Sequence, residues 1–419
     1  MAEDPDDSIS TFSYDGDGDP DTFGLHELRA VVNSHFHTIC SLERLAEGGY
    51  HKVYSIVQDD GTPLGVVRVA APAFPKDKTE SEVATLKLLA THTDVPVPKV
   101  YSWNSDASNP VGAEYMLMQK VPGFPASEKW DTLSMIVKES VVSQVAEHLM
   151  AIFALRFDSA GSLYLSASSE SGVIVGPIVS TPFYRALDGV VRIRDADATL
   201  HAELFRLRGP FSNTSDYLQS FLLAELHFLS HHRSVVLSEF SEEDEEAAVI
   251  RLEQGERVLQ KALELCSVYP GDIQIHEQET APIKPFSLRL DDFRLSNIMI
   301  DESGRVTGII DFEGATIAPL WECALLPRWL QDPDDPESTY EGGSAENRQI
   351  LRALFLDKVE NEEWKALYEQ GKPFRLLSDR LQFQVGVWAS DDMEAWVDER
   401  LAWAKDHPGV GFPERNIFR

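Results

Sequence analysis

The sequence predicts an α+β fold of two lobes, a small N-terminal lobe built on an antiparallel sheet and a larger, mostly helical C-terminal lobe. Short apolar strands alternate with turns between Leu42 and Met118, and helical periodicity dominates after Pro125. The 419 residues, of which 43% are hydrophobic, are enough for more than one hydrophobic core. We therefore divide the chain into an N-terminal lobe, residues 31–120, and a C-terminal lobe, residues 121–419.

Residues 1–30 are predicted to form an acidic, disordered tail. The first 23 residues contain eight acidic residues, no lysine and no arginine, and few apolar side chains that could offset the entropy cost of ordering. This composition fits neither a secretory signal nor a basic transit peptide, and the chain has no run of 18 apolar residues. We therefore expect a cytoplasmic protein without a membrane span.

The N-terminal lobe is predicted to contain an antiparallel sheet over residues 42–69, with a turn at Gly48 and Gly49. Apolar residues at helical spacing predict a helix over Thr79–Ala90. A further apolar strand is predicted at Ala113–Met118, immediately before the boundary between the lobes.

Beyond the boundary, helices are predicted over Lys138–Leu155 and Glu242–Leu265. His227 and His231 have the i,i+4 spacing of a zinc-binding pair on a helix. Phe228 replaces the glutamate of the metalloprotease motif, however, and no third ligand is evident along the sequence. The sequence alone therefore does not predict a zinc site.

A hairpin is predicted where Ile298–Ile300 and Val306–Ile310 flank a turn at Gly304. The residue that precedes the first strand of an antiparallel pair lies beside the residue that follows the second, so Asn297 and Asp311 should converge. An amide oxygen and a carboxylate at one sheet edge are suitable ligands for a Mg²⁺ ion that also binds phosphate oxygens. The hairpin therefore predicts a site for a metal-bound nucleotide.

Asp292 lies five residues before Asn297, and it could accept the proton of an attacking hydroxyl group. The order of Asp292, Asn297 and Asp311 is that of the catalytic Asp, the Asn and the metal-binding Asp of protein kinases. Arg294 lies where those enzymes have a lysine, so it could neutralise charge on the transferred phosphoryl group. We therefore predict Asp292 and Arg294 as catalytic residues.

Asp292–Asn297 together with Gly308–Glu313 resembles the fungal branch of the aminoglycoside phosphotransferase and choline kinase family, including members linked to mitochondrial inheritance. The likeness extends from about Leu42 to Pro327. In the N-terminal lobe it rests on four segments, Ala46–Tyr54, Glu80–Thr85, Pro96–Tyr101 and Gly112–Met118.

The resemblance implies a protein-kinase-like fold and an enzyme that transfers the γ-phosphoryl group of ATP, with Mg²⁺, to a hydroxyl group of a small molecule. It places a catalytic loop at residues 289–297 and a metal-binding loop at residues 309–314. It also implies the residues around the nucleotide: Gly48 and Gly49 over the phosphates, Arg68 as the phosphate clamp with Glu82 as its partner, and Met118, Gln119 and Lys120 at the adenine. Mitochondrial association is a further implication of the resemblance alone.

Two substitutions bear on activity. Leu290 departs from the family pattern by replacing the usual histidine, which supports the metal-binding loop, and Arg68 takes the place of the phosphate-binding lysine, as in many family members. They leave open a rival hypothesis, a pseudokinase that binds nucleotide or acts as a scaffold. A protein kinase is disfavoured, because Phe312 and Glu313 follow Asp311 and no Ala-Pro-Glu motif comes after them.

The formal charge of −32 disfavours nucleic acid and anionic lipid as partners, and such a surface would attract a cationic small molecule. The chain has no Gly-x4-Gly-Lys-Ser/Thr motif, which disfavours a P-loop enzyme. Its three cysteines provide no disulfide framework. The residues leave the identity of the acceptor, the choice between ATP and GTP, and the oligomeric state open.

Overall fold

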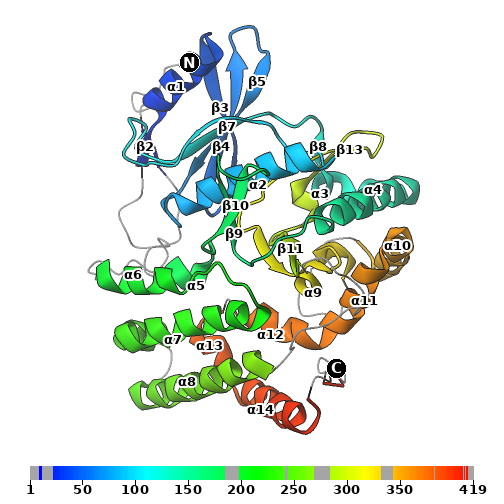
Figure 1. Ribbon diagram of the computed structural model, residues 1–419. Helices are drawn as coiled ribbons and strands as arrows, with labels where there is room; N and C mark the ends of the chain where they lie inside the picture. The colour runs from blue at the N-terminus through cyan, green and yellow to red at the C-terminus, as the bar shows by residue number, and fades with distance from the viewer. Residues whose placement is uncertain are drawn as a thin grey trace.

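In the computed structural model the chain forms two stacked lobes (Figure 1), which confirms the predicted α+β fold. Within the described residues no helix combines the length and the apolar character needed to cross a bilayer. The structure describes residues 9–11, 22–184, 198–240, 244–268, 284–331, 343–381, 383–408, 410 and 412–413.

The N-terminal lobe contains a five-stranded antiparallel sheet. The predicted three-stranded part is confirmed, but the sequence missed β6, whose polar residues and preceding prolines hide the strand pattern until β7 pairs with it. In spatial order the strands are β3 (Cys40–Glu47), β4 (His51–Gln58), β5 (Pro63–Ala70), β7 (Tyr115–Met118) and β6 (Val100–Asn104).

Two helices cover this sheet. Alternate residues of β5 and β7 contribute to different apolar clusters: Val67 and Leu117 share one with α1 (Leu25–Phe36), and Val66 and Met116 share the other with α2 (Asp77–His92). Because side chains alternate between the faces of a strand, each helix packs on its own face of the sheet. Helix α2 confirms the predicted helix and extends it at both ends.

The predicted tail extended too far along the chain. β2 (Thr22–Gly24) pairs with β1 (Ile9–Thr11), and the first half of α1 also lies within residues 1–30. The helix is ordered there because Leu28 is completely buried against the sheet, a tertiary contact that local composition does not reveal. Residues 1–8 and 12–21 of the predicted tail lie outside the described residues.

The C-terminal lobe is mainly helical, and α4 and α8 confirm the two helices predicted there with small shifts at their ends. The longer helices are α4 (Met135–Phe153), α6 (Ala198–Arg206), α7 (Thr214–Glu239), α8 (Glu245–Val268), α10 (Ala345–Lys358), α11 (Glu362–Gly371) and α14 (Asp391–Asp406). The shorter ones are α3 (Ala126–Lys129), α5 (Thr181–Tyr184), α9 (Leu320–Cys323), α12 (Arg375–Arg380) and α13 (Val385–Trp388). Single 3-10 turns are Trp130–Thr132, Leu295–Asn297, Arg328–Leu330 and Lys372–Phe374.

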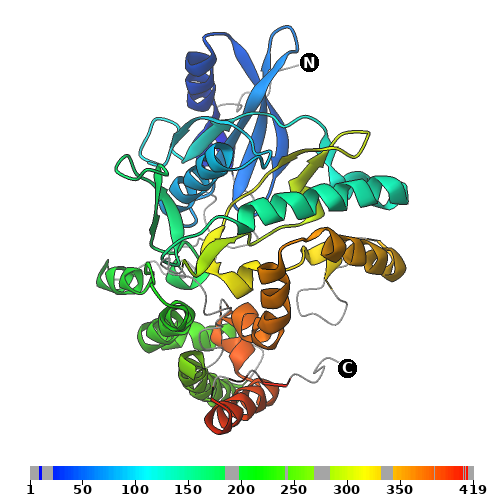
Figure 2. The same ribbon diagram turned by 45° about the vertical axis from the view of Figure 1, so that its right-hand side comes forward.

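Three small sheets support the loops of this lobe. β9 (Ser162–Leu165) pairs with β10 (Val173–Gly176), and β11 (Phe286–Arg289) pairs with β14 (Thr316–Pro319). The third joins β8 (Phe124–Pro125), β12 (Ile298–Ile300) and β13 (Val306–Ile309). Figure 2 shows β12 and β13 reaching up beside the N-terminal lobe, so this lobe's loops lie directly below the large sheet.

The predicted hairpin is confirmed. Ile298 is paired with Ile309, and the N–H of Ile310 donates to the carbonyl of Asn297 at 2.9 Å. Gly304 has a φ of +81°, a conformation that glycine adopts without strain. The register therefore brings the backbone of Asn297 next to the residue before Asp311, as the pattern predicted.

Candidate active site

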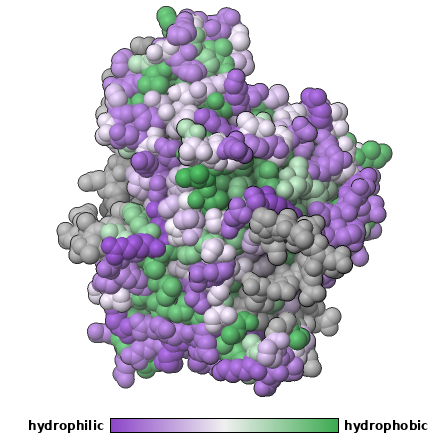
Figure 3. All heavy atoms as spheres, in the orientation of Figure 1, coloured by the Kyte–Doolittle hydropathy of each residue, from purple (hydrophilic) through white to green (hydrophobic). Residues whose placement is uncertain are grey.

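A cavity of about 1190 Å³ lies between the lobes. In Figure 3 apolar side chains, in green, gather where the lobes meet on this face. All eleven residues predicted for the site line the cavity: Gly48, Gly49, Arg68, Glu82, Met118, Gln119, Lys120, Asp292, Arg294, Asn297 and Asp311. The structure therefore brings together residues separated by up to 263 positions in the sequence, while their roles remain predictions.

Arg68 on β5 pairs with Glu82 on α2, as the resemblance implied. Its Nη1 lies 2.5 Å from Glu82 Oε1, and both side chains are buried. The other nitrogen, Nη2, lies 3.2 Å from Asp311 Oδ1 and 3.1 Å from Glu313 Oε2. The fork of one guanidinium thus joins the small sheet, α2 and the predicted metal-binding loop, which the single ammonium of a lysine could not do in the same way.

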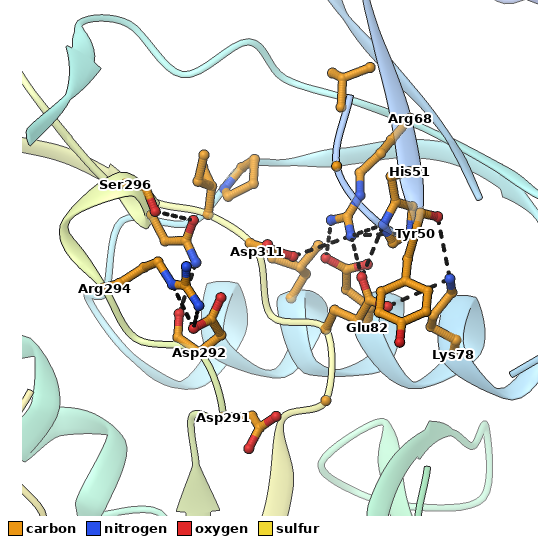
Figure 4. A pocket seen from close by; sticks show the side chains of 18 of the residues that line it. Tyr50, His51, Arg68, Lys78, Glu82, Asp291, Asp292, Arg294, Ser296 and Asp311 are labelled. Atoms are coloured by element: carbon orange, nitrogen blue, oxygen red, sulfur yellow. Dashed lines mark hydrogen bonds and ion pairs between the residues drawn. The ribbon is translucent and has the colours of Figure 1, made fainter. Parts of the chain in front are cut away.

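Glu313 is the centre of a second set of contacts, which the sequence did not predict. His51 Nδ1 lies 3.0 Å from Glu313 Oε2, and Lys78 Nζ lies 3.5 Å from Oε1. Figure 4 shows His51, Lys78, Arg68 and Glu82 converging on one side of the cavity. They come from β4, α2 and β5, so no short motif could have revealed the group; the only local signal was the glutamate that follows Phe312.

The pKa values of the two glutamates in this cluster are shifted in opposite directions. Burial raises the pKa of Glu82 to about 7, and Arg68 only partly offsets that effect. Burial would also raise the pKa of Glu313, but His51, Lys78 and Arg68 together hold it well below its usual range. Glu313 is therefore ionised at neutral pH, and it balances the positive charge of Lys78 and Arg68.

Asp311 occupies the turn between β13 and β14 with a φ of +65°, the left-handed region that non-glycine residues seldom adopt. Burial raises the pKa of its carboxyl group, and Glu313 and Asp292 add to this effect against the opposing charge of Arg68. Strained residues of this kind persist where the surrounding structure holds them, often at functional sites. The strain turns the Asp311 side chain into the cavity, between the two charged groups of Figure 4.

Asp292 lies in the second charged group. Its Oδ1 accepts a hydrogen bond from Arg294 Nε at 2.7 Å and lies 3.6 Å from Arg328 Nη1. Within the described part of the chain no hydrogen bond reaches Asp292 Oδ2. One carboxylate oxygen is thus held by two arginines, and the other can accept a proton. Arg328, from the 3-10 turn after Pro327, was not predicted.

Asn297 holds the loop that is predicted to be catalytic. Its Nδ2 donates to the carbonyl of Asp292 at 2.8 Å, while among the described residues its Oδ1 accepts a single long bond of 3.4 Å from Ser296. The amide nitrogen therefore holds the loop that carries Asp292, and the oxygen atom remains suitable as a metal ligand. The structure thus places an amide oxygen and the Asp311 carboxylate in the lining of the same cavity.

Two loops form the end of the cavity at which the nucleotide is predicted to bind. A Cβ added at Gly48 or Gly49 would meet no atom within 4 Å, so the protein itself leaves space above this turn. At the predicted hinge the N–H of Gln119 already donates to the carbonyl of Lys99 at 2.8 Å. Any backbone contact to a base at this hinge must therefore use another group than the Gln119 N–H.

Leu290, which replaces the family's histidine, packs against the main hydrophobic core. Beside it, Asp291 lies 3.7 Å from Arg289 and next to Gly314, where an added Cβ would come within 3.3 Å of its Oδ2. Apolar packing and this acidic contact therefore connect the two loops here. Because Gly314 has a φ of +74°, the close approach suits glycine.

We expect His51 to make the protein less stable in mild acid. Burial lowers its pKa to about 3, with Arg68 and Lys78 adding to the effect. Below about pH 6.5 the His51 side chain becomes protonated in the unfolded chain but stays neutral in the folded protein, which favours unfolding. The contribution of neutral His51 to the free energy of unfolding is therefore complete above pH 6.5 and declines as the pH falls towards 3. Between pH 6.5 and 5 the loss amounts to ~2 kcal/mol.

Urea unfolding of the protein and of His51→Gln at several pH values measures this effect. The variant should lose less of its unfolding free energy than the parent over this interval. A residual slope is expected, because burial also lowers the pKa of His148 and His227. Identical slopes for both proteins would contradict the assignment to His51.

The comparison with protein families matches residues 41–339 to the model of the phosphotransferase enzyme family. The chain belongs to this family. The match covers both lobes around the cavity and confirms the resemblance seen in the sequence. Membership establishes a kinase-like phosphotransferase in general, with the acceptor left open.

Two proteins similar to this chain come from fungi. A subtelomeric hrmA-associated cluster protein of Aspergillus fumigatus is 30% identical over 356 residues, which are 75% of this chain and 67% of the relative. The mitochondrial protein "altered inheritance of mitochondria protein 9" of Candida tropicalis is 24% identical over 370 residues, 80% of this chain. This chain spans only 56% of the Candida protein's length.

Among solved structures, a putative aminoglycoside phosphotransferase from Ralstonia eutropha is similar to this chain. The identity is 15% and the TM-score 0.46, with 92% of this chain and 99% of the other covered.

Proposed function

We propose that the chain transfers the γ-phosphoryl group of ATP, in a Mg²⁺-dependent reaction, to a hydroxyl group of a small molecule. The observation that carries this proposal is the arrangement around Asp292. Its Oδ2 accepts no hydrogen bond within the described residues, and Asn297 and Asp311 line the same cavity. A base and two oxygen ligands in one cavity are the groups that phosphoryl transfer to an alcohol requires.

In this proposal the residues that line the cavity have distinct roles. Asn297 Oδ1 and the Asp311 carboxylate would hold Mg²⁺, which supplies charge neutralisation for the phosphates. Arg68 would clamp the phosphates below Gly48 and Gly49, and the segment Met118–Lys120 would lie along the adenine. These residues would fix the phosphoryl group in line with the attacking oxygen.

Asp292 Oδ2 would accept the proton of the acceptor hydroxyl group as the oxygen attacks. Arg294 and Arg328 hold Oδ1, so the carboxylate keeps one orientation during the reaction. We infer that Arg294 orients the base in addition to its predicted role at the phosphoryl group. The acceptor would enter beside Asp292, where the lining includes Val179, Ser180, Tyr217, Phe221 and Thr316.

A thermal-shift measurement followed by an acceptor panel tests the proposal. ATP should raise the melting temperature only when Mg²⁺ is present, and Asp311→Ala should abolish this dependence, because it removes one of the two metal ligands. ATP turnover would then be measured against hydroxylated small molecules with and without amino groups, since the acidic surface favours cationic acceptors. Stabilisation by ATP that ignores Mg²⁺ and Asp311 would contradict the proposed metal site.

A second candidate function is a pseudokinase that binds nucleotide without transferring phosphate. Two observations favour it: Leu290 stands where the family has a histidine that supports the loop, and Arg68 Nη2 lies 3.2 Å from Asp311 Oδ1, the carboxylate proposed to bind Mg²⁺. Mg²⁺-dependent stabilisation by ATP without turnover of any acceptor would support this reading. For the location we propose the cytoplasm, with the mitochondrion as the alternative that the name of the Candida relative suggests. Cell fractionation would distinguish the two locations.

A further inference from the structure

A cluster of two histidines and one glutamate lies outside the cavity, where α6 packs on α7. Figure 1 shows both helices in green on the left of the molecule. His227 and His231 lie one turn apart on α7, and their ring centroids are 4.4 Å apart. Glu203 comes from α6, and its Oε2 lies 3.3 Å from His227 Nε2. The third polar group that the sequence could not identify is therefore supplied by another helix.

The nitrogen atoms of both rings are arranged for metal binding. His231 Nδ1 lies 2.9 Å from the carbonyl of His227, which can only accept, and 2.8 Å from the Ser230 hydroxyl, which itself donates to that carbonyl; a proton on Nδ1 satisfies these contacts and leaves the lone pair on Nε2. His227 Nε2 is buried, and among the described residues it has an ion-pair contact with Glu203 at 3.3 Å but no hydrogen bond. A hydrogen bond that fixes one ring nitrogen while the other points to a metal is the usual support of a histidine ligand.

The pair keeps its helical geometry. The backbone of α7 departs from helical angles at His232, where φ is −126°, one residue after the second histidine. His227 and His231 thus remain one above the other on the same face. All three ligand atoms lie within 4.8 Å of one another. Ligands at ~2.1 Å from a tetrahedral zinc ion are ~3.4 Å apart. His227 and Glu203 already satisfy this separation, and the ligand atom of His231 lies within 4.8 Å of both.

We propose that His227, His231 and Glu203 form a binding site for a zinc-like divalent ion, with water as the fourth ligand. Two imidazoles and a carboxylate suit Zn²⁺ and Co²⁺ better than Mg²⁺ or Ca²⁺, which prefer oxygen ligands. Phe228 takes the place of the catalytic glutamate of metalloproteases, and it is fully buried. The position of the metalloprotease base thus carries an apolar side chain, and we assign the ion a structural role.

The ion would fasten α6 to α7. Helix α7 also supplies Tyr217 and Phe221 to the wall of the cavity, near the predicted acceptor position. A metal near the middle of α7 would thus stabilise the helix whose first turns shape the cavity. The exposed fractions of the side chains, 20% for His227 and 42% for Glu203, give the ion access from solvent.

Titration of the untagged, metal-free protein with Zn²⁺ alone tests the site, with Mg²⁺ in excess and nucleotide absent. We expect one Zn²⁺ per chain with micromolar affinity, measured by calorimetry, and a rise in melting temperature. His231→Gln and Glu203→Gln should each weaken binding at least tenfold. His92→Gln, which replaces an exposed histidine at the end of α2, is the matched control and should bind as the parent does.

Co²⁺ provides a second readout, because a four-coordinate Co²⁺ ion absorbs visible light far more strongly than the hydrated ion. The parent and His92→Gln should develop this absorption, and His231→Gln should not. Absence of Zn²⁺ binding by the parent would overturn the proposal. Binding that survives Glu203→Gln unchanged would also overturn it, since two histidines on one helix would then account for the affinity without α6.

Discussion

Replacement of Asp292 with asparagine is expected to lower kcat by about 10²–10⁴-fold, the contribution of a positioned general base. The amide has nearly the shape of the carboxylate and can keep a contact with Arg294, but it cannot accept the proton of the acceptor. Because Asp292 has no predicted contact with the nucleotide, the affinity for ATP and Mg²⁺ should change little. Steady-state turnover with the best acceptor of the panel, together with a nucleotide-binding measurement, separates these effects.

Asp291→Asn provides the comparison for Asp292→Asn. It removes the neighbouring carboxylate, which pairs with Arg289 and contacts the Gly314 loop, and it leaves the predicted base in place. We expect a much smaller loss of kcat. Equal turnover by Asp292→Asn and the parent would exclude Asp292 as the base, and an equal loss in both variants would point to damage of the loop instead.

Replacement of Arg68 with methionine is expected to lower the free energy of unfolding by ~3–5 kcal/mol. The change removes one partner of a buried ion pair, which leaves Glu82 without its cation and weakens the environment of Asp311 and Glu313. Arg68→Lys keeps the positive charge and should recover a large part of the loss. Urea denaturation at pH 7 measures all three proteins.

A double-mutant cycle of Arg68→Met and Glu82→Gln is the control for the predicted destabilisation. In the Glu82→Gln background the carboxylate that suffers most from the loss of Arg68 is absent, so Arg68→Met should destabilise that variant by less than it destabilises the parent. Strictly additive effects would contradict a direct interaction. The result does not depend on an acceptor, so it remains informative if the chain proves to be a pseudokinase.

The local part of the site could be predicted from the sequence. Asn297 and Asp311 flank a hairpin whose turn and strand pattern are contained in a dozen residues, and the structure has that hairpin. Two neighbouring strands fix their own register, so this prediction needed no tertiary information. The Arg68 and Glu82 pair came from the family resemblance, and the 2.5 Å contact confirms the pairing.

The residues that the sequence missed reach their sites through tertiary structure. Lys78 and His51 meet Glu313 across more than 230 positions of sequence, and Glu203 meets His227 from another helix. Single lysines, histidines and glutamates carry no signal of this kind until the elements pack. The same reason explains strand β6, which exists because β7 offers a partner, and the ordered residues before Leu28.

The contact between Arg68 and Asp311 has a consequence for how ligands enter. The 3.2 Å contact means that the carboxylate predicted to bind Mg²⁺ already has a positively charged neighbour. Free Mg²⁺ would have to displace Arg68 from Asp311, and the guanidinium would then keep only its contacts with Glu82 and Glu313. ATP with its bound Mg²⁺ supplies a new partner to each group at the same time: phosphate oxygens to Arg68 and the metal ion to Asp311. We therefore expect an exchange of partners in one step, in which metal and nucleotide each raise the affinity for the other.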